Sequence, residues 1–176
     1  GDYNIANGYQ ALYSNTTGNS NTANGNRALY LNTTGTRNVA NGVHSLYSNT
    51  TGNYNTANGD GTLFSNTTGD YNIANGYQAL YSNTIGDNNT ANGVQSLYSN
   101  TTGANNTANG YKALRSNTTG SYNTAIGFNA DVTTVDLTNA TAIGYNAQVS
   151  ASNKIRLGDT NVTSIEGQVA WTNASD

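Results

Sequence analysis

The residues that could perform acid–base catalysis are few and scattered along the chain. His44 is the single histidine, and it occupies a variable slot of a repeated phrase that elsewhere holds glutamine, arginine, glycine or lysine. Such variation is typical of a solvent-facing position, and no nucleophile, base and orienting group can be assembled around this imidazole. The carboxylates fall mostly in turns, at Asp2, Asp60, Asp70, Asp87, Asp131, Asp136, Asp159 and Glu166. The sequence therefore predicts a protein that is not an enzyme.

Residue spacing gives little support for a metal or a cofactor. Asp159, Asn161 and Thr163 alternate as in a calcium loop, but this stretch lacks the glycine and the distal glutamate of such a loop. The chain has no cysteine and no methionine, so it offers no thiolate to a metal or a disulfide. We therefore expect no cofactor and no metal site, and the spacing alone leaves calcium binding open.

Tyrosines are the side chains best suited to hold a ligand. Sugar rings stack on aromatic faces, and neighbouring Asn and Gln side chains can bond sugar hydroxyls. The candidate ligand face comprises Tyr3, Tyr9, Tyr54, Tyr71, Tyr77 and Tyr111. Irregular placement of these tyrosines argues against one dedicated site. Glycan recognition is therefore one alternative function.

Threonines suggest a second alternative function. One slot of the repeated phrase holds threonine at Thr22, Thr56, Thr90 and Thr107, and threonine pairs recur in another slot. A flat, regular array of hydroxyls could bind ice. Ile5, Val39 and Ile73 interrupt the first threonine column. An ice-binding β-solenoid is thus the second alternative.

A repeat of 17 residues must position all of these side chains. Its units begin at Gly1, Gly18, Gly35, Gly52, Gly69, Gly86, Gly103 and Gly120, and they read approximately G-x-x-N-[TIV]-A-N-G-x-x-[AST]-L-[YF]-S-N-T-T. A fixed period marks stacked coils that bury a shared core. The many Gly, Asn and Thr residues disfavour helices. The predicted fold class is all-β, a parallel β-solenoid wound as a flattened β-roll with 17-residue coils.

Each unit is predicted to contain two short strands and two turns. The first strand is the N-[TIV]-A stretch, such as Asn4-Ile5-Ala6, and an Asn-Gly turn ends it. The second is the [AST]-L-[YF]-S stretch, such as residues 11–14, after which Asn-Thr-Thr-Gly turns the chain into the next coil. Stacked coils would place equivalent residues above one another as parallel strands.

Two columns follow from this stacking. The structural core column is Leu12, Leu29, Leu46, Leu63, Leu80, Leu97 and Leu114, with small alanines opposite. The adjacent column is Tyr13, Tyr30, Tyr47, Phe64, Tyr81 and Tyr98, and it ends at Arg115. Neighbouring residues of a strand point to opposite faces, so one of the two columns must face outward. Because only 35% of the chain is hydrophobic, we expect that outward column to pack against identical chains.

The C-terminal coils keep the period and change the residues. Ile126 and Ile143 take the slot of Asn7, and Val132 and Val149 take the slot of Tyr13. This change predicts that the two slots share a buried face, which makes the earlier Asn column a candidate hydrogen-bonded ladder inside the roll or at an interface. The predicted domains are a repeat β-roll of about nine coils over residues 1–153 and a C-terminal β cap over 154–176 that includes Trp171.

Two phrases near the C-terminus resemble a known family. Thr124-Ala-Ile-Gly-Phe-Asn-Ala130 and Thr141-Ala-Ile-Gly-Tyr-Asn-Ala147 resemble the repeats of YadA-like heads of trimeric autotransporter adhesins. The resemblance implies a left-handed parallel β-roll assembled as a homotrimer. The seven N-terminal units differ from that family, because they carry Asn where its phrase has Ile and because their coils are longer.

The last residues resemble a second segment. Residues 153–167, followed by Trp171 and by Ser175-Asp176, are similar to the segment that leads into the endosialidase-type intramolecular chaperone of phage tail fibres. In that family the chaperone assembles the trimer and is then cut off between a Ser and an Asp. Ser175-Asp176 matches this junction, and the chaperone domain itself is missing from these 176 residues.

The expected function is a structural and adhesive segment of a trimeric surface fibre or tail fibre. The resemblance implies an extracellular location, on a bacterial cell surface or a virion tail fibre, with a host-surface glycan or protein as partner. Six Lys and Arg residues in a chain of net charge −3 exclude the basic stripe that nucleic-acid binding requires. No run of about 18 apolar residues is present, so no membrane insertion by this segment is expected.

Overall fold

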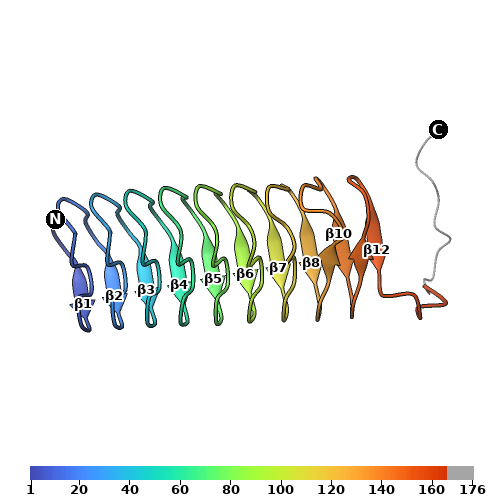
Figure 1. Ribbon diagram of the computed structural model, residues 1–176, viewed down its shortest axis with the longest axis horizontal. Coiled ribbons are helices and arrows are strands. Elements are labelled where there is room, and N and C mark those ends of the chain that lie inside the picture. The colour runs from blue at the N-terminus through green and yellow to red at the C-terminus, as the bar shows by residue number, and fades with distance from the viewer. Residues whose placement is uncertain (166–176) are drawn as a thin grey trace.

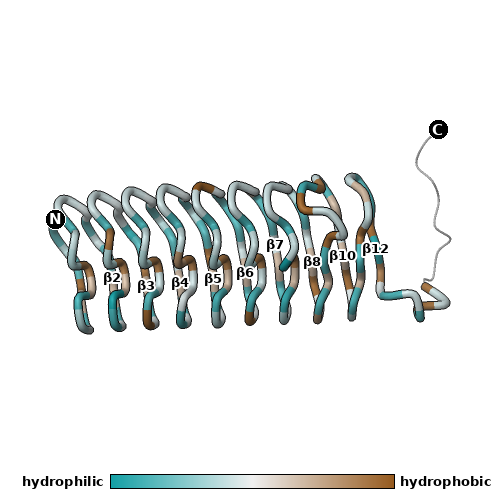
Figure 2. The backbone as a smooth tube through the Cα atoms, viewed as in Figure 1, coloured by the Kyte–Doolittle hydropathy of each residue, from teal (hydrophilic) through white to brown (hydrophobic). Residues whose placement is uncertain are grey.

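The chain winds into a parallel β-solenoid whose coils stack along one long axis (Figure 1). The computed structural model describes residues 1–165, so Glu166, Trp171 and the Ser175-Asp176 junction lie outside the described residues. Figure 2 shows hydrophobic residues recurring as short segments on a tube that is otherwise hydrophilic or intermediate. The all-β solenoid predicted from the repeat is confirmed, and residues 1–165 contain no helix.

One sheet runs the length of the solenoid. Its ten strands lie in the order β1-β2-β3-β4-β5-β6-β7-β8-β10-β12, and β9 and β11 form a second, two-stranded sheet. The strands are β1 Ile5–Asn7, β2 Thr22–Asn24, β3 Val39–Asn41, β4 Thr56–Asn58, β5 Ile73–Asn75, β6 Thr90–Asn92, β7 Thr107–Asn109, β8 Thr124–Ile126, β9 Asp131–Val132, β10 Thr141–Ile143, β11 Gln148–Val149 and β12 Ile155–Leu157.

Strand pairing follows the repeat. Ala57 lies beside Ala74, its equivalent in the next coil, and every other pairing from β1 to β10 keeps this 17-residue register. The final pairing is shorter, because Thr141 lies beside Ile155 after only 14 residues. β12 therefore extends the main sheet with a more compact coil, and the sheet continues past residue 153.

The prediction of a second strand in each of the first seven units is wrong. The [AST]-L-[YF]-S stretch forms a turn there, and its leucine has a φ between 49° and 54° in every unit. Extended backbone has a negative φ, so this left-handed residue interrupts any strand. A short strand replaces the turn only in the last coils, where β9 and β11 carry Asp131 and Gln148 in the leucine slot.

The core consists of small and branched apolar residues. The central alanine of each strand from β2 to β8 is fully buried, and so are six of the seven members of the leucine column, with Leu12 9% exposed in the first coil. Alternation along the strand points each alanine inward and its two neighbours outward. Leucine and alanine thus face one another across a thin interior.

Two ladders of asparagine side chains complete the interior. Asn66 Nδ2 donates to Asn49 Oδ1 at 2.8 Å and to Gly69 O at 3.0 Å. In the other ladder, Asn55 Nδ2 donates to Gly69 O at 2.8 Å. A Cβ on Gly69 would lie 2.5 Å from Asn66 Oδ1, so the glycine that opens each unit allows this close approach.

The last two full coils differ from the expected arrangement. Val132 and Val149 are buried, whereas Ile126 and Ile143 are 43% and 39% exposed. The prediction that these slots share a face is wrong, because each isoleucine follows an inward alanine in its strand and therefore points outward. The valines point inward because the backbone here is extended and no longer turns.

Candidate functional site

The outward side of the main sheet, here called the strand face, carries the residues on either side of the central alanine of each strand. Ile5, Ile73, Ile126 and Ile143 are between 39% and 60% exposed on this face. The threonine hydroxyls of four other strands of this sheet, Thr22, Thr56, Thr90 and Thr107, make no hydrogen bond within residues 1–165. The strand face is therefore flat, regular and partly apolar.

An outer asparagine ladder runs along the strand face beside these residues. Asn24, Asn41, Asn58, Asn75 and Asn92 are linked by Nδ2 to Oδ1 hydrogen bonds of 2.7 to 2.9 Å. Most members are half-buried. The ladder pairs one amide N–H and one carbonyl of each inner member along the solenoid axis, so covering this surface would leave few amide groups unpaired.

The structure divides the predicted ligand face into two columns that flank the strands. Tyr3, Tyr54 and Tyr71 precede the strands, and Tyr9, Tyr77 and Tyr111 follow them. Tyr54 and Tyr71 stack on each other at 4.8 Å, and Arg37 lies 5.1 Å from the centroid of the Tyr54 ring. Tyr54 and Tyr71 therefore cover part of each other's ring, and they remain 40% and 54% exposed.

The column of tyrosines that follows the strands continues into residues that the sequence analysis did not assign to a site. Tyr111 stacks on Phe128 at 4.9 Å, and Phe128 stacks on Tyr145 at 5.6 Å. Their spacing of 17 residues was the signal that could have assigned them to this column. Tyr3, Tyr9 and Tyr77 have no stacking partner among residues 1–165. The six predicted tyrosines thus do not form one site.

On the outside of the roll beside the leucine column, Tyr13, Tyr30, Tyr47, Phe64, Tyr81 and Tyr98 form one continuous stack, here called the aromatic ladder. Ring centroids are 5.0 to 5.3 Å apart and the planes are within 13° of parallel. The faces of the rings cover one another, so the ladder presents ring edges and hydroxyls. No hydrogen bond within residues 1–165 engages the tyrosine hydroxyls of the ladder.

A variable column flanks the aromatic ladder, and two of its members, Arg27 and His44, pack on ladder rings, whereas the Lys112 ammonium lies over Tyr111. This flanking column is Gln10, Arg27, His44, Gly61, Gln78, Gln95 and Lys112. The guanidinium carbon of Arg27 lies 5.6 Å from the Tyr30 ring centroid, and the His44 ring meets Tyr47 edge-on at 5.6 Å. Arg115, which follows Tyr98 in the ladder slot, lies 5.4 Å from the Tyr98 ring. His44 is thereby placed in an aromatic contact.

Charge is distributed unequally between these surfaces. The ladder and its flanking column hold Arg27, Lys112 and Arg115 together with His44, and they contain no carboxylate. The acidic residues of the first seven units are Asp2, Asp60, Asp70 and Asp87, and they occupy other columns. Although the chain is acidic overall, the ladder and its flanking column carry only positive charge, and we refer to the two together as the ladder face.

Asp131 is a buried carboxylate whose surroundings change its pKa. It occupies the leucine slot of its coil and accepts hydrogen bonds from the backbone N–H of Val132 at 2.8 Å and of Ser116 at 3.1 Å. Burial raises the pKa of Asp131 above its ordinary value, and the hydrogen bonds and Arg115 only partly oppose this effect. Asp131 therefore takes the place that follows the last leucine of the leucine column, and its contacts there are structural.

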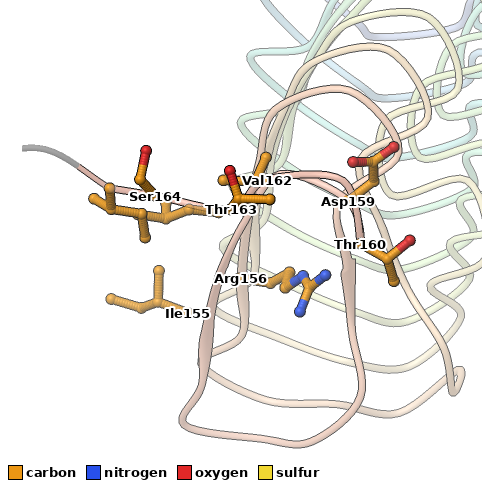
Figure 3. Close-up of a pocket in the computed structure, with 9 residues that line it drawn as sticks. Ile155, Arg156, Asp159, Thr160, Val162, Thr163 and Ser164 are labelled. Carbon is orange, nitrogen blue, oxygen red and sulfur yellow. The ribbon is translucent and has the colours of Figure 1, made fainter.

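A hollow of about 770 Å³ lies at the C-terminal end of the solenoid (Figure 3). Ile155, Leu157 and Val162 line it together with Arg156 and Asp159. Asp159 accepts hydrogen bonds from the backbone N–H and the side-chain amide of Asn161, so two residues of the stretch that partly matches a calcium loop contact each other. Within residues 1–165 no group of three or more His, Asp or Glu side chains could hold a metal ion.

Comparison of the sequence with models of known protein families gives no match, and comparison with curated proteins gives no significant match. Within the described residues, no helix is long and apolar enough to cross a membrane. The fold and its surfaces define the class of protein as a repetitive parallel β-solenoid with two contrasting outer surfaces, the strand face and the ladder face.

Proposed function

We propose that this chain is a structural and adhesive segment of a trimeric extracellular fibre, on a bacterial surface or a virion tail. Three copies pack their strand faces around a common axis, and the ladder faces point outward. The resemblance to YadA-like heads supports the number three and a left-handed winding. The observation that carries the proposal is the flat strand face, where exposed isoleucines lie beside an asparagine ladder that is already hydrogen-bonded.

The strand face suits an interface better than the aromatic ladder does. Exposed β-branched side chains on a rigid sheet lose little rotamer freedom when a partner covers them. In contrast, the ladder rings already cover each other's faces, so a partner would gain less apolar contact there. We therefore place the interface on the strand face, in preference to the aromatic column that the sequence suggested.

Ice binding would require the same strand face to be free. The unpaired threonine hydroxyls favour that function, but Ile5, Val39 and Ile73 take alternate places in their column. A face that is buried in a trimer cannot contact ice. A measurement of molecular mass in solution therefore separates ice binding from the trimeric fibre, and a monomer with thermal hysteresis would support ice binding.

Light scattering coupled to size exclusion tests the proposal. We expect a mass three times the 18.3 kDa of one chain at micromolar concentration. The double variant Ile73→Lys/Ile126→Lys should dissociate the assembly, because charges on this face cannot be buried without partners. Ile85→Lys is the matched control, since Ile85 is 53% exposed and lies off the strand face. A parent that is monomeric, or a strand-face variant that stays trimeric, would contradict this interface.

A further inference from the structure

We propose that the ladder face binds a linear acidic polysaccharide that lies along the fibre axis. This inference rests on the proposed function, because it names the class of molecule to which the adhesive fibre would attach. The sites of contact would be the edges of the aromatic ladder and the side chains of its flanking column. Three properties of this face favour such a ligand, namely its charge, its unpaired hydrogen-bonding groups and its repeat.

The charge of the face selects an anion. Arg27 lies near one end of the aromatic ladder and Arg115 lies at the other, and neither the ladder nor its flanking column contains a carboxylate. Arg115 also interacts with the carboxylate of Asp131, which is buried in the leucine slot of the next coil. Arg27 Nε donates one hydrogen bond to Gln10 Oε1 at 2.9 Å, which leaves most of the five guanidinium N–H groups free. Guanidinium groups bind carboxylates and sulfates with paired hydrogen bonds. A molecule that spans the face would therefore carry negative groups along its length.

Between the two arginines the face offers neutral hydrogen-bonding groups. Hydroxyls of Tyr47 and Tyr81 have no partner within residues 1–165, and Gln95 Nε2 donates only to Gln78 Oε1, at 3.1 Å. Hydroxyl and amide groups of this kind suit the hydroxyls of sugars. The stacked rings offer edges to a ligand and keep their faces covered, so hydrogen bonds dominate over sugar–aromatic stacking.

The repeat of the face selects a polymer. Adjacent rings are 5.0 to 5.3 Å apart over the whole ladder. Arg27 and Arg115 are separated by five coil spacings, which amounts to roughly 24 Å at about 4.8 Å for each parallel strand. A compact ligand would meet only one or two coils. An extended chain of sugars would meet every coil and both arginines, and many weak contacts would add along it.

The chain itself supplies substitutions that test this inference, at positions where the repeat already holds other residues. Gln occupies the slot of Arg27 in three other units, and Tyr occupies the slot of Arg115 in most units. The double variant Arg27→Gln/Arg115→Tyr therefore restores residues that this solenoid already accommodates and removes two charges. Thermal unfolding of the double variant checks its stability, because Arg115 also offsets the charge of the buried Asp131. Arg37→Asn is the matched control, because Asn88 and Asn105 occupy its slot and Arg37 lies among the residues that precede the strands.

The binding experiment uses immobilised protein and a panel of polygalacturonate, alginate and chondroitin sulfate, with methyl-esterified polygalacturonate as the neutral counterpart. We expect at least one acidic chain to bind, the ester to bind weakly, and salt to weaken binding through screening. Each arginine removed should raise the dissociation constant about threefold, and the pair about tenfold, as for exposed ion pairs. Arg37→Asn should bind like the parent. Tyr47→Phe/Tyr81→Phe should bind more weakly, since only hydroxyls are lost.

Several results would overturn the inference. They are failure of all three acidic polysaccharides to bind, binding that the double variant retains in full, and binding of a single-stranded DNA oligomer as tight as that of the best polysaccharide. Light scattering on the same samples separates this inference from the proposed function. A monomer that still binds acidic polysaccharides through Arg27 and Arg115 would contradict the proposed trimer alone. A trimer that binds no acidic polysaccharide would contradict this inference alone.

Discussion

At the scale of single residues, the leucine column combines burial with an uncommon backbone. Leu63 is fully buried at a φ of 51°, and a bulky residue rarely adopts a positive φ because its Cβ approaches the carbonyl oxygen. That conformation costs about 1–2 kcal/mol. Burial of the leucine side chain contributes roughly 1.5–3 kcal/mol. The turn therefore persists because it aims the largest apolar side chain of each unit into the core.

Asp131 makes the stability of the fold depend on pH. Because burial raises its pKa in the folded chain above the ordinary value of 3.8, the unfolded chain releases this proton first as the pH rises. Stability should therefore fall between about pH 3.8 and the raised pKa, and it should stay lower above that range. The variant Asp131→Asn keeps an oxygen that can accept from Ser116 and cannot ionise. We expect it to be at least as stable as the parent at neutral pH.

Thermal unfolding at several pH values, at one fixed protein concentration, measures this effect. The control is Asp136→Asn, because Asp136 is exposed. The parent and the Asp136→Asn protein should lose stability together as the pH rises, and the Asp131→Asn protein should lose less. Equal slopes for the parent and Asp131→Asn would show that burial of this carboxylate is not the cause.

At the scale of the element, the coils are tied together by side-chain ladders as well as by backbone hydrogen bonds. The inner ladder of Asn49, Asn66 and Asn83 is fully buried, and each Nδ2 pairs with both a side-chain and a backbone oxygen. The outer ladder on the strand face uses the same amide chemistry in a half-buried setting. A change at one coil of the inner ladder therefore affects the coils on both sides.

Asn66→Asp tests this difference with an isosteric change. An aspartate keeps the acceptor for Asn83 Nδ2 but loses the donor to Asn49 Oδ1 and Gly69 O. A buried acceptor that loses its partner costs about 1–3 kcal/mol, and more beside a charge. Asn58→Asp makes the same change in the outer ladder. Urea denaturation should show a loss of several kcal/mol for Asn66→Asp and a much smaller loss for Asn58→Asp.

Similar losses for the two asparagine variants would mean that burial does not distinguish the ladders. The comparison is made at equal protein concentration, because the proposed association of copies would also stabilise the fold. If the strand face is buried in a trimer, Asn58→Asp should in addition lower the mass measured by light scattering, and Asn66→Asp should leave the mass of the folded protein unchanged.

The period predicted the solenoid because equal spacing in the sequence forces equal residues into register. It also predicted the strand around Ala57 and the stacking of Leu63 with its equivalents. The turn at Leu63 could not be predicted from the sequence. The residue types Leu-Phe-Ser favour a β-strand, and the positive φ of Leu63 is visible only in the folded backbone. The opposite orientations of Ile126 and Val132 were missed for the same reason, since strand and turn alternate differently in the last coils.

The candidate site was predicted less well than the fold. The tyrosines before and after each strand were grouped as one face by residue type, although the strand separates them. The contrast in charge between the ladder face and the other columns was present in the sequence. It became interpretable only when Arg27 and Arg115 were placed on the same stack of rings.

At the scale of the whole molecule, we propose that one side of the roll contacts other copies and that the other side binds a ligand. The strand face has exposed isoleucines and a self-paired amide ladder, and the ladder face has cations and free hydroxyls. In the proposed trimer this division would stabilise a thin core, because the assembly would bury the apolar side chains that a single roll leaves exposed. It would also leave a continuous surface for adhesion along the proposed fibre.

The rate at which single thiols react tests this division most directly, because the chain has no cysteine of its own. Thr90→Cys places a thiol on the strand face, and Gln95→Cys places one beside the aromatic ladder in the same coil. Both parent residues are half-buried in the single chain. We predict that a thiol reagent modifies the protein slowly at position 90 and rapidly at position 95 under native conditions, and equally fast in urea. Equal rates in the native protein would contradict the account.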